Sequence, residues 1–192
     1  MQKGQTLIEL LVAMFVIVVG LTAATNVIFS NSRAQEESAQ RVVGANLARE
    51  GVELAKAVRD SNWIAGGATS FVEGLADGAD YTAVPRMEGG AFIDFDFTPD
   101  LMSDAGTIIR RSTNTNSAGL FVQGTDASGA ATIYRRLVTL SPICQDGSIL
   151  LSGDTCDSTN PQNGVRVSSL VEWTNRSGVH ESLVEDDLYD WR

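Results

Sequence analysis

The sequence predicts an α+β protein in which one long N-terminal α-helix packs on a C-terminal antiparallel β-sheet head. Three observations support this fold class. An apolar run extends from Leu10 to about Phe29. Apolar residues then recur with helical spacing up to residue 60. The end of the chain alternates apolar and polar residues, as half-buried strands do.

The apolar run has the length of a membrane-spanning helix. Residues 5–29 supply the roughly 20 apolar residues that cross a bilayer. Glu9 is the only charged residue in this stretch, and a carboxylate deep in a bilayer costs roughly 2.5–3.5 kcal/mol, so its presence needs a reason. A conventional signal peptide cleaved near Ala23-Ala24-Thr25 is the alternative, but it leaves Glu9 unexplained. Lys3 favours a cytoplasmic N-terminus.

Residues 30–60 have the pattern of an amphipathic helix. One apolar face is marked by residues that step by 4, 7 and 4, namely Val43, Leu47, Leu54 and Val58. Smaller residues widen this stripe: Val42, Ala45, Ala48, Val52 and Ala55. Gly44 and Gly51 each weaken the helix by about 1 kcal/mol relative to alanine. We therefore expect local bending or melting there, and a helix end near Asp60.

Residues 61–192 are expected to form the β-rich head. A connector runs to about Pro85, and a half-buried strand follows in which Ile93, Phe95 and Phe97 face inward. Three later segments predict an antiparallel meander: 133–140, 165–174 and 179–189. Asn175-Arg176-Ser177-Gly178 supplies the last turn; it also matches a glycosylation sequon, but turn chemistry is the preferred interpretation. The apolar helix stripe is the expected cover for this sheet.

Composition and charge exclude several functions. The net charge is −10, which argues against a protein that coats nucleic acid. Arg110-Arg111 and Arg135-Arg136 are expected to be solvated strand charges, the alternatives being pairs with sheet-edge acids or contacts to DNA. His180 is the only histidine, and no nucleophile with a neighbouring base or phosphate-binding loop occurs. We therefore expect no enzyme.

The two cysteines, Cys144 and Cys156, predict one disulfide, since an extracytoplasmic chain with an even cysteine count favours pairing. Two buried free thiols are the alternative. The loop between them carries Asp146, Asp154 and Asp157, together with Asn160 and Asn163. Such oxygen ligands suit Ca²⁺, but the EF-hand spacing is absent. Solvated acids without a cofactor are the main expectation, and a calcium site is the alternative.

Gly4, Gln5 and Glu9 stand at fixed spacing within GQTLIELLVAMFVIVVGL. This segment resembles the class III signal segment of type IV prepilins and type II secretion pseudopilins. The resemblance implies that residues 1–4 are a leader, that prepilin peptidase cleaves after Gly4, and that Gln5 is then N-methylated. It also implies that Glu9 neutralises the new ammonium group, in its own chain or in a neighbouring subunit. Most family members have Phe or Met after the cut, where this chain has Gln5.

The closing segment VRVSSLVEWTNRSGVHESLVEDDLYDWR resembles minor pilins and accessory pseudopilins more than major subunits. The resemblance implies a structural subunit of a type IV pilus-like filament. Its implied partners are other pilin subunits, the prepilin peptidase, the inner-membrane assembly platform and, before assembly, the lipid bilayer. The precursor would lie in the cytoplasmic membrane and the product on the cell surface. Three alternatives stay open: a secretion pseudopilin, a DNA-uptake or adhesion pilin whose head recognises a ligand, and an anchored domain unrelated to filaments.

Overall fold

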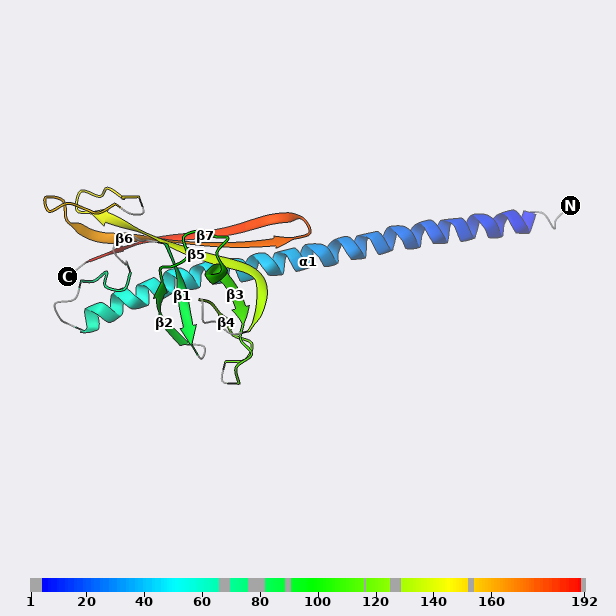
Figure 1. The fold of residues 1–192 in the computed structure, drawn as a ribbon. Coiled ribbons are helices and arrows are strands. Elements are labelled where there is room, and N and C mark those ends of the chain that lie inside the picture. The colour runs from blue at the N-terminus through cyan, green and yellow to red at the C-terminus, as the bar shows by residue number, and fades with distance from the viewer. Residues whose placement is uncertain are drawn as a thin grey trace. The chain divides into compact units, whose positions relative to one another are not determined.

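The computed structural model describes residues 5–65, 70–75, 82–88, 91–115, 117–124, 129–151 and 154–190, without the side chains of Gln5 and Thr6. Helix α1 spans Gln5–Ala65, five residues beyond the expected end. The other elements, shown in Figure 1, are β1 Thr82–Glu88, β2 Ala91–Asp96, η1 Ala105–Thr107, β3 Ile108–Arg111, β4 Phe121–Val122, β5 Ala130–Cys144, β6 Gln162–Asn175 and β7 Gly178–Tyr189. The chain divides into two compact units, Met1–Val42 and Val43–Arg192.

The second unit is built around the long strand β5, and all its strand pairs are antiparallel. One edge of β5 pairs with β6 along most of its length, and β7 then pairs with β6. The other edge of β5 is shared: β3 pairs near its start, and β1 pairs at Val138 and Thr139. β4 extends the sheet beyond β3, and β2 extends it beyond β1. The predicted meander is confirmed as β5, β6 and β7.

The inward positions of β6 were also predicted correctly. Val165, Val167, Val171 and Trp173 are each at most 2% exposed. The prediction for the earlier strand was wrong at Ile93, which is 49% exposed, whereas Phe95 is buried. The register between β1 and β2 shifts between Arg86 and Met87. Such a bulge breaks the two-residue alternation, because one strand contributes an extra residue there.

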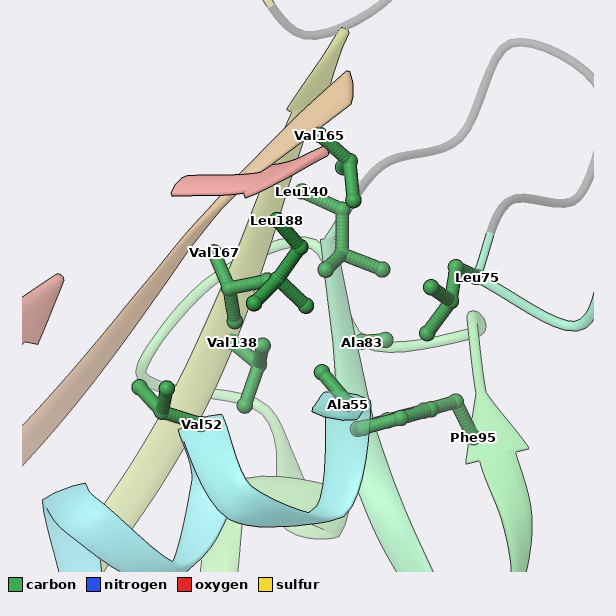
Figure 2. Packing of buried hydrophobic residues seen from close by; sticks show 10 residues of the cluster. All are labelled: Val52, Ala55, Leu75, Ala83, Phe95, Val138, Leu140, Val165, Val167 and Leu188. Atoms are coloured by element: carbon green, nitrogen blue, oxygen red, sulfur yellow. The ribbon is translucent and has the colours of Figure 1, made fainter. Parts of the chain in front are cut away.

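The face of α1 that packs on the sheet is lined by small residues. Its buried positions follow steps of three and four: Gly44, Leu47, Ala48, Gly51, Val52 and Ala55. Figure 2 shows Val52 and Ala55 pointing toward Val138 and Val167 in the core. Val43, Leu54 and Val58, expected at the centre of this face, are only partly buried beside the two core clusters.

Both glycines are required by the close approach of α1 to the sheet. A Cβ atom on Gly44 would lie 2.6 Å from Cζ3 of Trp173, and one on Gly51 would overlap Oγ of Ser169. The predicted melting at these positions was wrong, since α1 is continuous through both. Packing explains why: glycine lets the helix backbone lie against β6, and the core that forms there offsets its low helix propensity.

A buried polar network joins α1 to β5. Arg136 is 1% exposed. Its Nη1 donates to the carbonyl of Leu47 and to Oε2 of Glu50, both at 2.9 Å, and its Nε donates to Oε1 of Gln123 at 2.8 Å. Burial lowers the pKa of Arg136, and the Glu50 carboxylate opposes this effect. The expectation of a solvated Arg136, and its DNA-contact alternative, were therefore wrong.

Arg135 faces the opposite side of the sheet and holds the loop before β3. Its Nη1 donates to the carbonyls of Met102, Ser103 and Asp104 at 3.0–3.3 Å. Three carbonyls converging on one guanidinium fix a segment that has little regular structure of its own. Arg135 is thus a structural residue as well.

Candidate membrane-anchoring and assembly site

The first part of α1 is apolar on every side. The large apolar side chains from Leu7 to Phe29 are between 49% and 69% exposed. This stretch has about 23 residues and so extends about 35 Å, slightly more than the roughly 30 Å hydrocarbon core of a bilayer. The helix is long and apolar enough to cross a membrane. A helix that is apolar all round requires lipid or other helices around it.

The few hydroxyl groups of this stretch are satisfied within the helix. Oγ1 of Thr22 donates to the carbonyl of Val19 at 2.9 Å, and Oγ1 of Thr25 donates to the carbonyl of Leu21 at 3.0 Å. A hydroxyl that donates to a carbonyl of its own helix adds little desolvation cost when the helix enters lipid. The polar content of the helix therefore does not oppose membrane insertion.

Glu9 is exposed on the surface of this helix. Within the part of the chain that the structure describes, no ion pair includes its carboxylate. Gly4 and the side chain of Gln5 lie outside the described residues, so the predicted cleavage and methylation sites are not placed. Glu9 is left as a single acid one helical turn from Gln5, in a surface otherwise suited to hydrocarbon.

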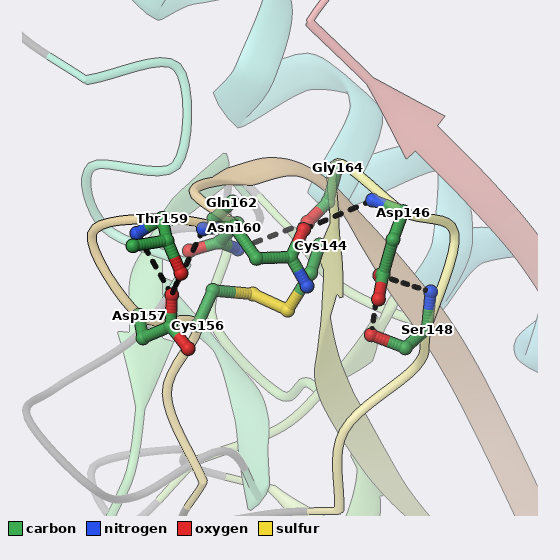
Figure 3. Close-up of a disulfide and its surroundings, with 9 residues drawn as sticks. All are labelled: Cys144, Asp146, Ser148, Cys156, Asp157, Thr159, Asn160, Gln162 and Gly164. Carbon is green, nitrogen blue, oxygen red and sulfur yellow. Dashed lines mark hydrogen bonds between the residues drawn. A yellow bond between two sulfur atoms is a disulfide. The ribbon is translucent and has the colours of Figure 1, made fainter.

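The cysteine pair closes a loop at the end of β5. Cys144 and Cys156 form the predicted disulfide, with their Cα atoms 5.7 Å apart. Figure 3 shows two acids beside it, Asp146 and Asp157, hydrogen-bonded within the loop. Oδ1 of Asp146 accepts from the amide and hydroxyl of Ser148 at 2.9 and 2.6 Å. These hydrogen bonds lower the pKa of Asp146 to about 2.

Asp157 is held in the same way. Its Oδ1 accepts from the amide and hydroxyl of Thr159 and from the amide of Asn160. These donors lower the pKa of Asp157. In the described parts of the chain, no three His, Cys, Asp or Glu side chains are grouped to hold a metal. The calcium site at Asp146, Asp154 and Asp157 stays a prediction.

The turn between β6 and β7 has the predicted Asx chemistry. Oδ1 of Asn175 accepts from the amide of Ser177 at 2.8 Å, and Gly178 has a φ of 129°. The ring of His180 stacks on that of Trp173 with centroids 5.6 Å apart, and its Nε2 lies 3.0 Å from Oγ of Ser177. The only histidine is thus engaged in closing the hairpin.

Comparison with known protein families completes the description of the N-terminal segment. Residues 1–25 match the family model for the prokaryotic N-terminal methylation motif, which is the signature of type IV pilins and pseudopilins. The chain carries the N-terminal signature shared by type IV pilins and pseudopilins. A search of curated proteins and a search of solved structures gave no match. The motif supports a structural subunit of pilin or pseudopilin type.

Proposed function

We propose that this chain is a minor subunit of a type IV pilus-like filament. One observation carries the proposal: the methylation motif opens a helix whose first part, up to Phe29, is apolar on all sides and contains one acid, Glu9. The precursor inserts in the cytoplasmic membrane, prepilin peptidase cleaves after Gly4, and the new N-terminal amine of Gln5 is methylated. The assembly platform then transfers the subunit to the filament on the cell surface.

Cleavage after Gly4 gives Glu9 a partner. The cut creates an ammonium group on Gln5, and four residues of helix correspond to about 6 Å along the axis. Two unpaired charges in hydrocarbon are more costly than a pair. If Glu9 pairs with Gln5 of its own chain, the pair neutralises both charges. If it pairs with Gln5 of a neighbouring subunit, it also sets the axial register of assembly.

Transfer from lipid to a helix bundle keeps the apolar surface away from water. Ala13, Gly20, Ala23 and Ala24 are small enough for neighbouring helices to approach closely. A Cβ atom on Gly20 would meet nothing within 4 Å in the isolated chain. The chain itself therefore leaves this position open, and in a bundle of subunits a neighbouring helix would pack there.

Mass spectrometry of the mature N-terminus in sheared surface filaments tests the proposal. We expect an N-terminal peptide that begins at Gln5 and carries one added methyl group. Gly4→Val should retain the leader and abolish incorporation. Glu9→Gln should be cleaved normally but incorporated at a much lower level, whereas Ala13→Ser is a matched conservative control in the same helix. A native product that keeps Met1, or that begins after Ala24, would contradict the proposal.

A type II secretion pseudopilin is the second candidate, because the methylation motif is shared by both classes. Deletion of the gene distinguishes them. Loss of surface filaments with normal protein secretion supports the pilus, and the reverse result supports the pseudopilin. A head that binds DNA is a third variant, tested by DNA binding across a range of salt concentrations. Arg136 is not available for such binding because it is buried.

A further inference from the structure

Residues 30–42 of α1 lie between the apolar first part of the helix and the part that packs on the sheet. The apolar part ends at Phe29, and the first buried position of α1 among the described residues is Gly44. Within residues 30–42 all side chains are exposed except those of Glu37 and Gln40, which are half-buried. When the apolar part lies in lipid, this segment is therefore supported by neither lipid nor sheet.

The start of this segment favours the helix weakly. Ser30, Asn31 and Ser32 are consecutive. Each of these residue types supports a helix about two-fold less well than alanine, because its short polar side chain competes for backbone hydrogen bonds. An ion pair between Arg41 and Glu37, at 2.7 Å, favours the helix by about two-fold, but it lies beyond these three residues and does not span them.

The helix on either side explains why the segment is nevertheless helical. Because α1 continues in both directions, the segment needs no nucleation, and its helicity depends on propagation alone. Propagation is weakest where three poor helix formers follow one another. A segment with few buried contacts and water-exposed backbone hydrogen bonds also opens locally far more readily than a packed one.

The other weak positions of α1 are held by their surroundings. Gly44 and Gly51 pack against Trp173 and Ser169. Gly20 lies in the apolar part, where an opened backbone would leave N–H and C=O groups unsatisfied in hydrocarbon. Water can satisfy the same groups just beyond Phe29. Local opening is therefore concentrated there.

We infer that Ser30, Asn31 and Ser32 form a hinge in α1, at which the helix opens transiently and lets the head turn relative to its membrane anchor. Lipid holds the apolar part helical while the hinge opens, and the sheet holds the part that begins at Gly44. The head of an anchored subunit can then change its orientation before the apolar helix leaves the bilayer. The inference goes beyond the proposed function and requires only that α1 joins a membrane to the head.

Amide hydrogen exchange of the full chain in lipid nanodiscs tests the opening. The amides of residues 33–36, which follow the hinge by one helical turn, should exchange at least 100-fold faster than those of residues 48–55. The triple variant Ser30→Ala, Asn31→Ala and Ser32→Ala should slow exchange at residues 33–36 about ten-fold, which corresponds to roughly 1.4 kcal/mol.

Ser38→Ala is the matched control, because Ser38 is exposed on the same helix but lies outside the hinge. It should change exchange at residues 33–36 by no more than about two-fold. Equal exchange rates in residues 33–36 and 48–55 would overturn the hinge. A triple variant that exchanges as wild type does would also overturn it.

Distances between spin labels test whether the opening turns the head. Labels on Ile28→Cys, in the anchor, and Ile93→Cys, on β2, are measured by double electron–electron resonance in nanodiscs. The distance distribution should be broad in the wild-type background and at least two-fold narrower in the triple alanine variant. Ile93→Cys with Leu183→Cys is the control within the head, and its width should not change. An unchanged width for the pair at 28 and 93 would overturn the hinge.

These measurements use the chain in a membrane, so their outcome is separate from the filament assay. A rigid α1 would reject the hinge and leave the pilus function standing. A mobile hinge in a chain that enters no filament would support the hinge and reject the pilus function.

Discussion

A methyl group on Gly51 tests the close packing of α1 against β6. In Gly51→Ala the added Cβ overlaps Oγ of Ser169 and lies 3.0 Å from its Cβ and 3.3 Å from Cγ2 of Val138. Alanine would favour the helix by about 1 kcal/mol in an exposed position. Overpacking a buried site costs about 1–3 kcal/mol, and a direct overlap with Oγ of Ser169 places the cost in the upper half of that range, about 2–3 kcal/mol. After the helix gain is subtracted, the expected net loss is about 1–2 kcal/mol of unfolding free energy.

Ser169 provides a specific rescue. Its Oγ is buried and has no hydrogen-bond partner among the described residues, so Ser169→Ala removes both the overlapping atom and an unsatisfied hydroxyl. We expect Ser169→Ala alone to be neutral or slightly stabilising, because its buried hydroxyl makes no compensating bond. Combined with Gly51→Ala, it should recover much of the loss. The remaining contacts with Val138 should prevent complete recovery.

Guanidinium unfolding of the detergent-solubilised full chain, followed by tryptophan fluorescence, measures the effect. If the unfolding free energy falls by about 3 kcal/mol per molar guanidinium chloride, Gly51→Ala should lower the denaturant concentration at the unfolding midpoint by about 0.5 M. Ala57→Gly is the control at an exposed position on the same helix. It changes helix propensity without changing core packing, and it should lower the unfolding free energy by about 1 kcal/mol. A Gly51→Ala chain that is as stable as wild type or more so would refute the packing argument.

Three further predictions use the same unfolding assay. Arg136→Met should cost about 3 kcal/mol, because it leaves the buried acceptors that this guanidinium satisfies without a donor; a loss below 1 kcal/mol would contradict this. Replacing Cys144 and Cys156 by serine should cost about 3 kcal/mol through greater freedom of the unfolded chain, and equal midpoints would contradict the estimate. Arg166 lowers the pKa of Asp187 from 3.8, so this carboxylate stabilises the fold above that pH and loses its effect as pH falls through its lower folded value. The stability difference between wild type and Asp187→Asn should therefore be constant above about pH 5 and shrink below pH 4, and a difference independent of pH would refute the role of ionisation.

Local patterns were sufficient for several features. The apolar run and the alternation in β6 were read correctly, because each depends on the period of one element against one apolar environment. The disulfide followed from the even cysteine count. The Asn175 turn followed from local Asx chemistry. The motif at residues 1–25 was evident because its spacing lies within one segment.

Positions that depend on distant neighbours were not predictable in the same way. Gly44 and Gly51 look like weak points in a helix until Trp173 and Ser169 are placed against them. Arg136 looks like a surface charge until β5 brings it beneath α1, 86 residues away from Glu50 in the chain. The burial of a side chain is decided by which elements pack together. Contacts between residues that are far apart in the sequence produce no periodic pattern along the chain, so the sequence alone does not reveal them.

The sequence by itself determined the membrane-length helix, the single acid within it, the methylation motif and the β-meander, because these are properties of composition and period along the chain. Only the tertiary structure decided which helix face meets the sheet, and that Arg136 is a buried link between α1 and β5 rather than a solvated charge. These features arise when elements distant in sequence become neighbours, since burial is a property of that arrangement in space.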